Sequence, residues 1–158
     1  MKRFAVLLVL FLVVCHPAFG ALKVSLVTDP EVGRASKHGL EKFRRALEAK
    51  GIQIEDAKEA SAATGDAVVV AGLSQGAGPA ASLVLKFAWG VYTVPESLVI
   101  HKLNDGKKPL LLIGGSDDRG LMYALLDVAD RVGWSTKSAD PFSEVHDTME
   151  KPDAPERG

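Results

Sequence analysis

One short segment holds most of the residues that could do chemistry. The apolar run Leu110 to Ile113 is followed by Gly114-Gly115-Ser116-Asp117-Asp118-Arg119-Gly120. Glycines between a strand and a helix can cradle a phosphate, because the first backbone N–H groups of the helix point at it. Here Asp117 and Asp118 would already occupy that positive helix end, so a phosphate would meet like charge. The segment also lacks Gly-Lys-Ser/Thr and a complete Gly-x-Gly-x-x-Gly spacing, which argues against nucleotide binding.

The acidic pair is better explained as part of a helix terminus. Adjacent carboxylates point in different directions, so Asp117 and Asp118 do not flank one bond as a glycosidase pair must. Serine and aspartate are favoured at helix N-termini, and we expect Ser116, Asp117 and Asp118 to hold this one, with Ser116 as the cap. Gly120 would let the helix approach the sheet closely. Arg119 would then bind a carboxylate or carbonyls at a chain end.

The other candidate groups are scattered along the chain. Three histidines show no metal-ligand spacing and are interpreted as solvated: His38, His101 and His146. A group near the C-terminus could coordinate a cation, although a charged, solvated tail is the simpler interpretation: Glu144, His146, Asp147 and Glu150. Ser74 and Ser116 lack the Gly-x-Ser-x-Gly setting of a nucleophile. We therefore predict no catalytic residue, no metal and no cofactor.

Composition describes one globular domain. Among 158 residues, 47% are hydrophobic and 25% charged, a balance that can exclude water from a core. The chain has nineteen Lys and Arg residues and twenty Asp and Glu residues, so its formal net charge is −1. This balance does not give the basic surface that a nucleic-acid binder needs. A single cysteine excludes an internal disulfide and every zinc site built on cysteines.

Residues 1–20 have the pattern of a signal peptide. Lys2 and Arg3 precede an apolar run from Phe4 to Val14, which is too short to span a bilayer. Small residues at Ala18 and Gly20 then predict cleavage before Ala21. This predicts a secreted or periplasmic protein that is free of the membrane after cleavage. An uncleaved membrane anchor is the alternative, and bulky Val14 disfavours lipidation of Cys15.

Hydrophobic periodicity predicts the elements of residues 21–134. Strands are expected at 22–27, 52–55 and 67–72, and a hairpin at 97–103 and 109–114 around Asn104-Asp105-Gly106. A first helix is expected to begin at Pro30 with Asp29 as its N-cap and to end at Gly51. A helical turn is expected within 57–65, a second helix from Gly76 to about Phe87, and a third from Asp117 to Val132, ended by Gly133.

A hairpin stands where a doubly wound fold would have another crossover helix. We therefore predict an α/β (α+β) two-layer sandwich, with a mixed sheet, a C-terminal hairpin and its main helices on one face. Residues 135–158 contain prolines and acids without periodicity and are interpreted as a linker or docked tail. Three aromatic residues fall at element ends, where they could stack on sugar rings, pack in the core or meet another domain: Trp89, Tyr92 and Trp134.

The stretch from Pro95 to Val132 resembles a known family. With its hairpin, the run Gly115-Ser116-Asp117-Asp118-Arg119-Gly120-Leu121-Met122-Tyr123-Ala124 is similar to the N-terminal non-catalytic α/β domain of glycoside hydrolases, including family 20 β-N-acetylhexosaminidases and α-glucuronidases. That family's turn reads Gly-x-Asp-x-Arg-Gly-x-x-Tyr-Gly, and Ala124 replaces the last glycine. The likeness is diffuse from Ala21 to Gly90.

The resemblance implies a two-layer accessory domain whose motif is structural: Gly115, Asp117, Asp118, Arg119, Gly120 and Tyr123. In those enzymes the catalytic carboxylates sit on a (β/α)8 barrel, which this chain lacks, and residues 152–158 resemble the approach to that barrel. We thus expect a secreted, non-catalytic domain that packs its helical layer against a barrel in cis or in trans. A free-standing sugar-binding module is the alternative, as is a small α/β enzyme using phosphate or a metal near Gly114 to Arg119. The sugar itself is not indicated.

Overall fold

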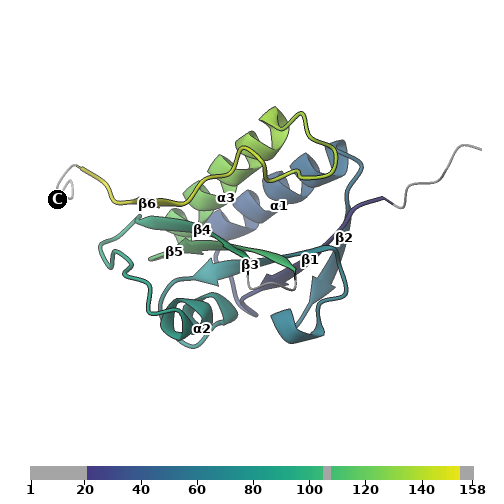
Figure 1. The fold of residues 1–158 in the computed structure, drawn as a ribbon. Coiled ribbons are helices and arrows are strands. Elements are labelled where there is room, and N and C mark those ends of the chain that lie inside the picture. Colours follow the sequence, from purple (N-terminus) through teal and green to yellow (C-terminus); the bar gives the residue numbers. More distant parts are fainter. Residues whose placement is uncertain (1–20, 105–107, 154–158) are drawn as a thin grey trace, which may run out of the picture.

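The computed structural model describes residues 21–104 and 108–153, so the expected signal peptide and the centre of the hairpin turn lie outside it. A mixed sheet forms the middle of the molecule, with six strands in the order β2-β1-β3-β5-β4-β6 (Figure 1). The strands are β1 (Lys23–Thr28), β2 (Gln53–Ala57), β3 (Ala67–Leu73), β4 (Leu98–Asn104), β5 (Pro109–Gly115) and β6 (Thr148–Glu150). No helix of the described residues is long and apolar enough to cross a membrane.

The sheet is parallel on one side and antiparallel on the other. Strands β2, β1, β3 and β5 run parallel, whereas β4 runs antiparallel to both β5 and β6. In the centre, Val69 lies between Leu26 and Leu111. The β4–β5 pair is the predicted hairpin, with Ile100 opposite Ile113. A hairpin in place of a crossover helix is what makes the sheet mixed, as predicted.

Two helices share one face of the sheet, and a third lies on the other (Figure 1). Helices α1 (Arg34–Ala49) and α3 (Asp118–Trp134) pack together over the larger core, which contains Val69 and Ala71 of β3. Val68 and Val70 point to the opposite face, where α2 (Pro79–Lys86) and a short 3₁₀ turn (Ala60–Ala62) cover a smaller core. The predicted α/β fold with its main helices on one face is confirmed. The smaller core explains why β3 is apolar at every position.

The start of α1 differs from the prediction. The helix begins at Arg34 with Gly33 as N-cap, and not at Pro30 with Asp29 as cap. The reason is that the Asp29 carboxylate accepts a hydrogen bond from the backbone N–H of Leu73, at the end of β3, over 2.8 Å. The C-terminal end is as expected, since Gly51 takes a φ of 73° just beyond the helix.

The C-terminal end of α3 also differs from the prediction. We predict that Gly133 ends this helix, but the helix includes Gly133 and continues to Trp134. Glycines with positive φ in the described chain are Gly51 and Gly76, so Gly133 does not adopt the conformation that terminates helices.

Residues 135–150 are docked on the fold and add the last strand. Phe142 and Val145, which are 5% and 0% exposed, join the core beneath α1 and α3. Thr148 to Glu150 then pair with β4 at the sheet edge. The prediction of a linker or docked tail therefore misses a strand. The segment has no alternating pattern because only a few of its side chains reach the core.

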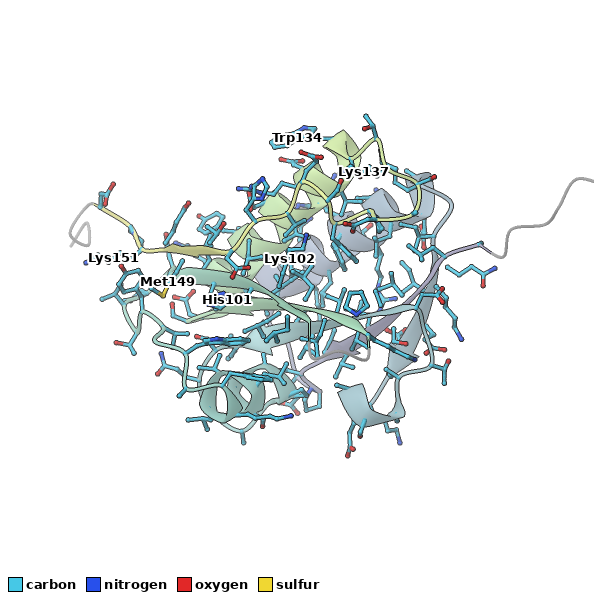
Figure 2. All side chains as sticks on the ribbon, in the orientation of Figure 1. His101, Lys102, Trp134, Lys137, Met149 and Lys151 are labelled. Atoms are coloured by element: carbon cyan, nitrogen blue, oxygen red, sulfur yellow. The ribbon has the colours of Figure 1, made fainter. Side chains whose placement is uncertain are left out.

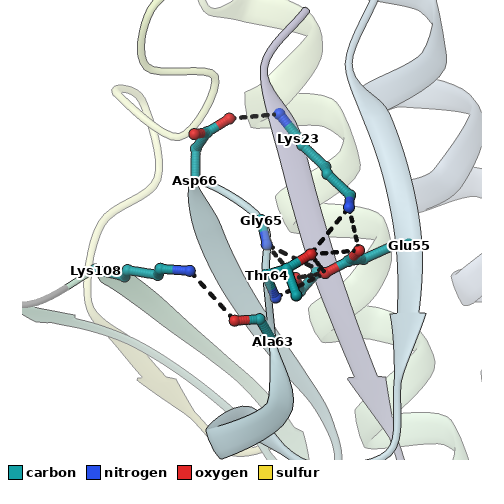
Figure 3. A network of polar contacts seen from close by, with 8 residues as sticks. Lys23, Glu55, Ala63, Thr64, Gly65, Asp66 and Lys108 are labelled. Carbon is teal, nitrogen blue, oxygen red and sulfur yellow. Dashed lines mark hydrogen bonds and ion pairs between the residues drawn. The ribbon is translucent and has the colours of Figure 1, made fainter.

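A polar network joins β1 and β2 to the loop before β3 (Figure 3). Glu55 of β2 accepts hydrogen bonds from the Ser25 hydroxyl over 2.5 Å and the Thr64 backbone N–H over 2.8 Å, and it pairs with Lys23. The Lys23 ammonium and these hydrogen bonds hold the pKa of Glu55 well below its usual value. The network ties together three segments that are distant in sequence.

Candidate functional site

The carboxyl ends of the parallel strands bring the candidate motif together with two other polar groups. Asp29 follows β1, Ser74 follows β3, and Ser116 to Asp118 follow β5. In α/β sheets this edge is where ligands usually bind, especially where neighbouring strands send the chain to opposite faces. Here β1 leads to α1 on one face and β3 to α2 on the other. Ser74 is engaged within the sheet edge, where its hydroxyl donates to the Gly115 carbonyl over 3.2 Å.

Asp117 caps its own helix. Its Oδ1 accepts the backbone N–H of Gly120 over 2.8 Å, which is the N-cap geometry for α3. Its Oδ2 accepts the backbone N–H of Glu96 over 3.0 Å, which fixes the loop before β4. Both oxygens of this carboxylate are thus engaged by backbone groups.

Asp118 caps the neighbouring helix. Its Oδ2 and Oδ1 accept the backbone N–H groups of Ala35 and Ser36 over 2.9 and 3.0 Å, in the first turn of α1. The Ser36 hydroxyl donates to the Asp118 carbonyl over 3.1 Å. Burial raises the pKa of Asp118, but the hydrogen bonds from Ser36 and Ala35 outweigh it and leave that pKa below the ordinary value. A β-carbon on Gly33 would lie 2.3 Å from the Asp118 carboxyl carbon, so glycine is needed there.

Ser116 is not the cap that we predict. Its hydroxyl donates to the Val94 carbonyl over 2.7 Å and accepts the Ser97 backbone N–H over 3.1 Å. These bonds attach the start of α3 to the loop before β4. The cap is Asp117, because Ser116 is drawn toward that loop.

The remaining motif residues have structural contacts. Arg119 pairs with Glu96 over 2.8 Å, in line with the expected carboxylate partner. A β-carbon on Gly120 would lie 2.2 Å from the Ser97 carbonyl oxygen. One on Gly115 would lie 1.9 Å from the backbone nitrogen of Leu121. Both glycines let α3 lie against the sheet, whereas Tyr123 points outward and is 41% exposed.

Asp29 is the group at this edge that sequence reasoning misplaced. It is 8% exposed, and its Oδ1 is buried without a hydrogen-bond partner in the described structure. Gly72 and Gly78 lie against it, since a β-carbon on either would come within 2.3 Å of that oxygen. Burial raises the pKa of Asp29 despite the hydrogen bond from Leu73. Gly72 and Gly78 are the signal in the sequence that a group packs closely here, but only the fold shows that this group is the Asp29 carboxylate.

Within the described residues, the three aromatic candidates do not stack on one another. The Trp89 indole is half-buried and stacks with Phe87 and His101, at ring-centroid distances of 5.0 and 4.6 Å. Tyr92 is 37% exposed and has the Lys151 ammonium 5.3 Å from its ring centroid. Trp134 is 67% exposed at the end of α3 (Figure 2). The structure therefore forms no joint aromatic platform from the three, and the Trp89 ring is already stacked.

A histidine–carboxylate pair was not expected from the sequence. Asp147 accepts the backbone N–H of Lys102 over 2.8 Å, and its other oxygen lies 3.1 Å from Nδ1 of His101. Burial raises the pKa of Asp147, but these two contacts bring it below the ordinary value. In the described residues, no three His, Cys, Asp or Glu side chains gather as a metal site would need. Asp147 thus holds the last segment against β4.

A mainly apolar hollow lies at the opposite, amino-terminal edge of the parallel strands. Its walls include Leu22 before β1, Asp66 before β3, Leu110 of β5 and Phe142 of the docked segment. None of the predicted site residues lines this hollow. The motif and the hollow are therefore separate features.

Comparison with known proteins supports the fold. No family model and no curated protein matches the sequence. Among solved structures, a GH138 enzyme targeting pectin rhamnogalacturonan II superposes with a TM-score of 0.53, at 15% identity over 82% of this chain. The 4-O-methyl-α-glucuronidase BtGH115A, of family GH115 and specific for decorated arabinogalactans, gives 0.53 at 18% identity over 73% of the chain. CpGH84D gives 0.58 at 13% identity over 75% of the chain.

The matched region is a small part of each of these proteins. It makes up 15%, 14% and 19% of their chains, respectively. Identities this low establish a common fold and do not transfer an activity. The same α/β fold thus occurs as one part of large glycoside hydrolase chains.

Proposed function

We propose that this chain is an exported, non-catalytic accessory domain of a carbohydrate-active glycoside hydrolase, packed against a catalytic (β/α)8 barrel. The observation that carries the proposal is the use of the acidic pair. Asp117 holds the N-terminus of α3 and Asp118 holds that of α1, so both carboxylates serve helix ends. The occurrence of this fold as a small part of glycoside hydrolase chains supports the same role.

The surface of α3 suggests where the barrel packs. Tyr123 and Trp134 are 41% and 67% exposed and lie three helical turns apart, so they share the outer face of α3. Exposed large aromatic side chains are enriched in protein interfaces. By contrast, the exposed large apolar residues of the described chain include none from α1. We therefore assign the contact to the α3 side of the helical layer.

The test uses the glycoside hydrolase barrel encoded nearest to this gene, co-expressed with the full chain. We expect the two to co-purify as an equimolar complex. Tyr123→Ser with Trp134→Ser should weaken that complex at least tenfold. Leu85→Ser is the matched control, because Leu85 is 76% exposed on α2, on the opposite face. Absence of a complex, an equal effect of the control, or turnover of an aryl glycoside by the chain alone would overturn the proposal.

A further inference from the structure

The outer face of α1 carries a stripe of positive charge. Four exposed basic side chains recur there at spacings that place them on one helical face, and we call them the α1 basic stripe: Arg34, Lys37, His38 and Lys42. Glu41 lies on the same face, between the turns that carry Lys37 and Lys42, and pairs with Arg45. Arg44 pairs with Asp56 of β2. Within the described residues, Arg34, Lys37 and Lys42 have no carboxylate in ion-pair distance.

The order of charges along α1 opposes the helix dipole. Acidic side chains favour the first turn of a helix and basic ones the last. The first turn of α1 has no acidic residue of its own and the last turn has no basic one, while Arg34 and Lys37 lie near the positive end. Asp118 offsets this in part, but its oxygens are taken by the first N–H groups of the helix. The stripe therefore does not serve the stability of α1.

Positive charge is concentrated on this helix. Helix α1 contains five Arg and Lys against two Glu, although the whole chain has a net charge of −1. The rest of the molecule is accordingly net negative. The stripe also has no exposed large apolar residue beside it on α1. These features suit a hydrated anionic ligand rather than an apolar partner surface.

We propose that the α1 basic stripe binds an anionic glycan, namely an oligosaccharide that carries carboxylates along its length. From Arg34 to Lys42 the stripe spans about 12 Å of helix, which suits several spaced charges better than one ion. Duplex DNA carries a charge every ~1.7 Å, a denser array than the few cations of one helix can match. The choice of a glycan among anionic polymers rests on the proposed function, whereas the stripe itself is an independent observation.

The experiment titrates the full chain with oligogalacturonate, with a neutral chito-oligosaccharide and with a short DNA duplex. We expect saturable binding of oligogalacturonate alone, weakened at least tenfold by Lys37→Glu with Lys42→Glu. Raising the salt from about 50 to 200 mM should weaken it as well, because the contacts are ionic. The control is Lys58→Glu with Lys86→Glu, which reverses two exposed lysines outside α1 and should leave binding within twofold.

Three results would overturn the inference. These are absence of oligogalacturonate binding, an equal loss in the control variant, and DNA binding as tight as that of the glycan. Urea unfolding of both double variants checks that they are folded. Co-purification with a barrel is a separate readout, so a chain that binds a barrel but no galacturonate would contradict this inference and leave the proposed function standing.

Discussion

At the scale of single residues, the two adjacent aspartates divide their work between two helices. Asp118 binds the N–H groups of Ala35 and Ser36, more than eighty positions away in the sequence. Asp118→Ala should therefore expose the first turn of α1 and lower the free energy of unfolding by about 1–2 kcal/mol, as the loss of a helix cap does. Urea unfolding at pH 7 measures this loss.

The matched control for that substitution is Asp130→Ala. Asp130 is exposed on the same helix, and in the described structure its side chain has no hydrogen bond or ion pair. Asp130→Ala should therefore change the free energy of unfolding by less than about 0.5 kcal/mol. Equal losses in the two variants would show that the Asp118 carboxylate does not cap α1.

Asp29 should make the protein less stable as the pH rises. Its folded pKa is raised above the ordinary 3.8, so the folded state holds the proton more tightly than the unfolded chain does. The resulting stabilisation is fully present below about pH 3.8 and is lost as the pH rises through the folded pKa. Asp29→Asn removes this titration. The free energy of unfolding of the wild type minus that of the variant should thus fall between pH 3 and pH 7, and a rising difference would contradict the raised pKa.

The residue types at the motif were sufficient to predict that its acids hold the N-terminus of a helix, but not that the two acids hold different helices. Arg119 has the carboxylate partner expected for it, and Gly120 lies where a side chain would clash with the loop before β4. The capping of α1 by Asp118 and the engagement of Ser116 with Val94 depend on segments that meet only in the folded chain. Local spacing contains no information about such partners.

At the scale of elements, two glycines of α3 should respond in opposite ways to the same substitution. A β-carbon on Gly120 would lie 2.2 Å from the Ser97 carbonyl oxygen, whereas one on Gly133 would have no atom within 4 Å. Gly120→Ala must push α3 from the loop before β4 and should destabilise by about 1–3 kcal/mol, as overpacking does. Gly133→Ala should stabilise by about 0.4–1 kcal/mol, because alanine loses less backbone entropy in a helix.

Thermal unfolding of the two variants checks this pair. The melting temperature should fall for Gly120→Ala and rise for Gly133→Ala. Loss of stability in both would mean that Gly133 has a packing role, and tolerance of both would mean that α3 can move away from β4 without cost.

The elements with strong periodicity were predictable, and the weakly patterned ones were not. The alternating or wholly apolar strands and the amphipathic α1 follow from spacing, because each buries a whole face or stripe. Strand β6 has three residues, of which two are exposed, so it leaves no pattern to detect. Phe142 and Val145 show the same limit, since two isolated apolar residues in a proline- and acid-rich segment gave no sign that they complete the core.

At the scale of the whole molecule, the mixed sheet was predictable because a hairpin stood in place of a crossover helix. The placement of α2 on the far face was not, since its short helix has no strong amphipathic pattern. The candidate site was likewise predictable in part. The adjacency of Asp117 and Asp118 predicts that this pair does not face one bond, but the charge asymmetry between α1 and the rest of the chain has meaning only once α1 is seen to be exposed along one face.

Three carboxylates hold distant parts of this fold together, and all three should stabilise the fold less at acidic pH. Glu55 joins β2 to β1, Asp118 joins α3 to α1, and Asp147 joins the docked segment to β4. The pKa of each is lower in the folded protein than its ordinary value. Each therefore stabilises the fold fully above its unfolded pKa, which is 4.5 for Glu55 and 3.8 for the aspartates. That stabilisation is lost as the pH falls through the folded pKa.

Glu55→Gln isolates one of these contributions at the scale of the whole chain. The substitution removes a titrating group but keeps an acceptor for Ser25 and Thr64, so the variant should be less stable than the wild type at pH 7. The gap should narrow as the pH falls from 5 to 2, because the unfolded chain, with the ordinary pKa of 4.5, takes up a proton at Glu55 before the folded wild type does. Urea unfolding at pH 7, 5, 3 and 2 measures the gap. A constant gap would show that the Lys23–Glu55 pair is already screened by water, and that the hydrogen bonds of the network hold β1, β2 and the loop before β3 together without it.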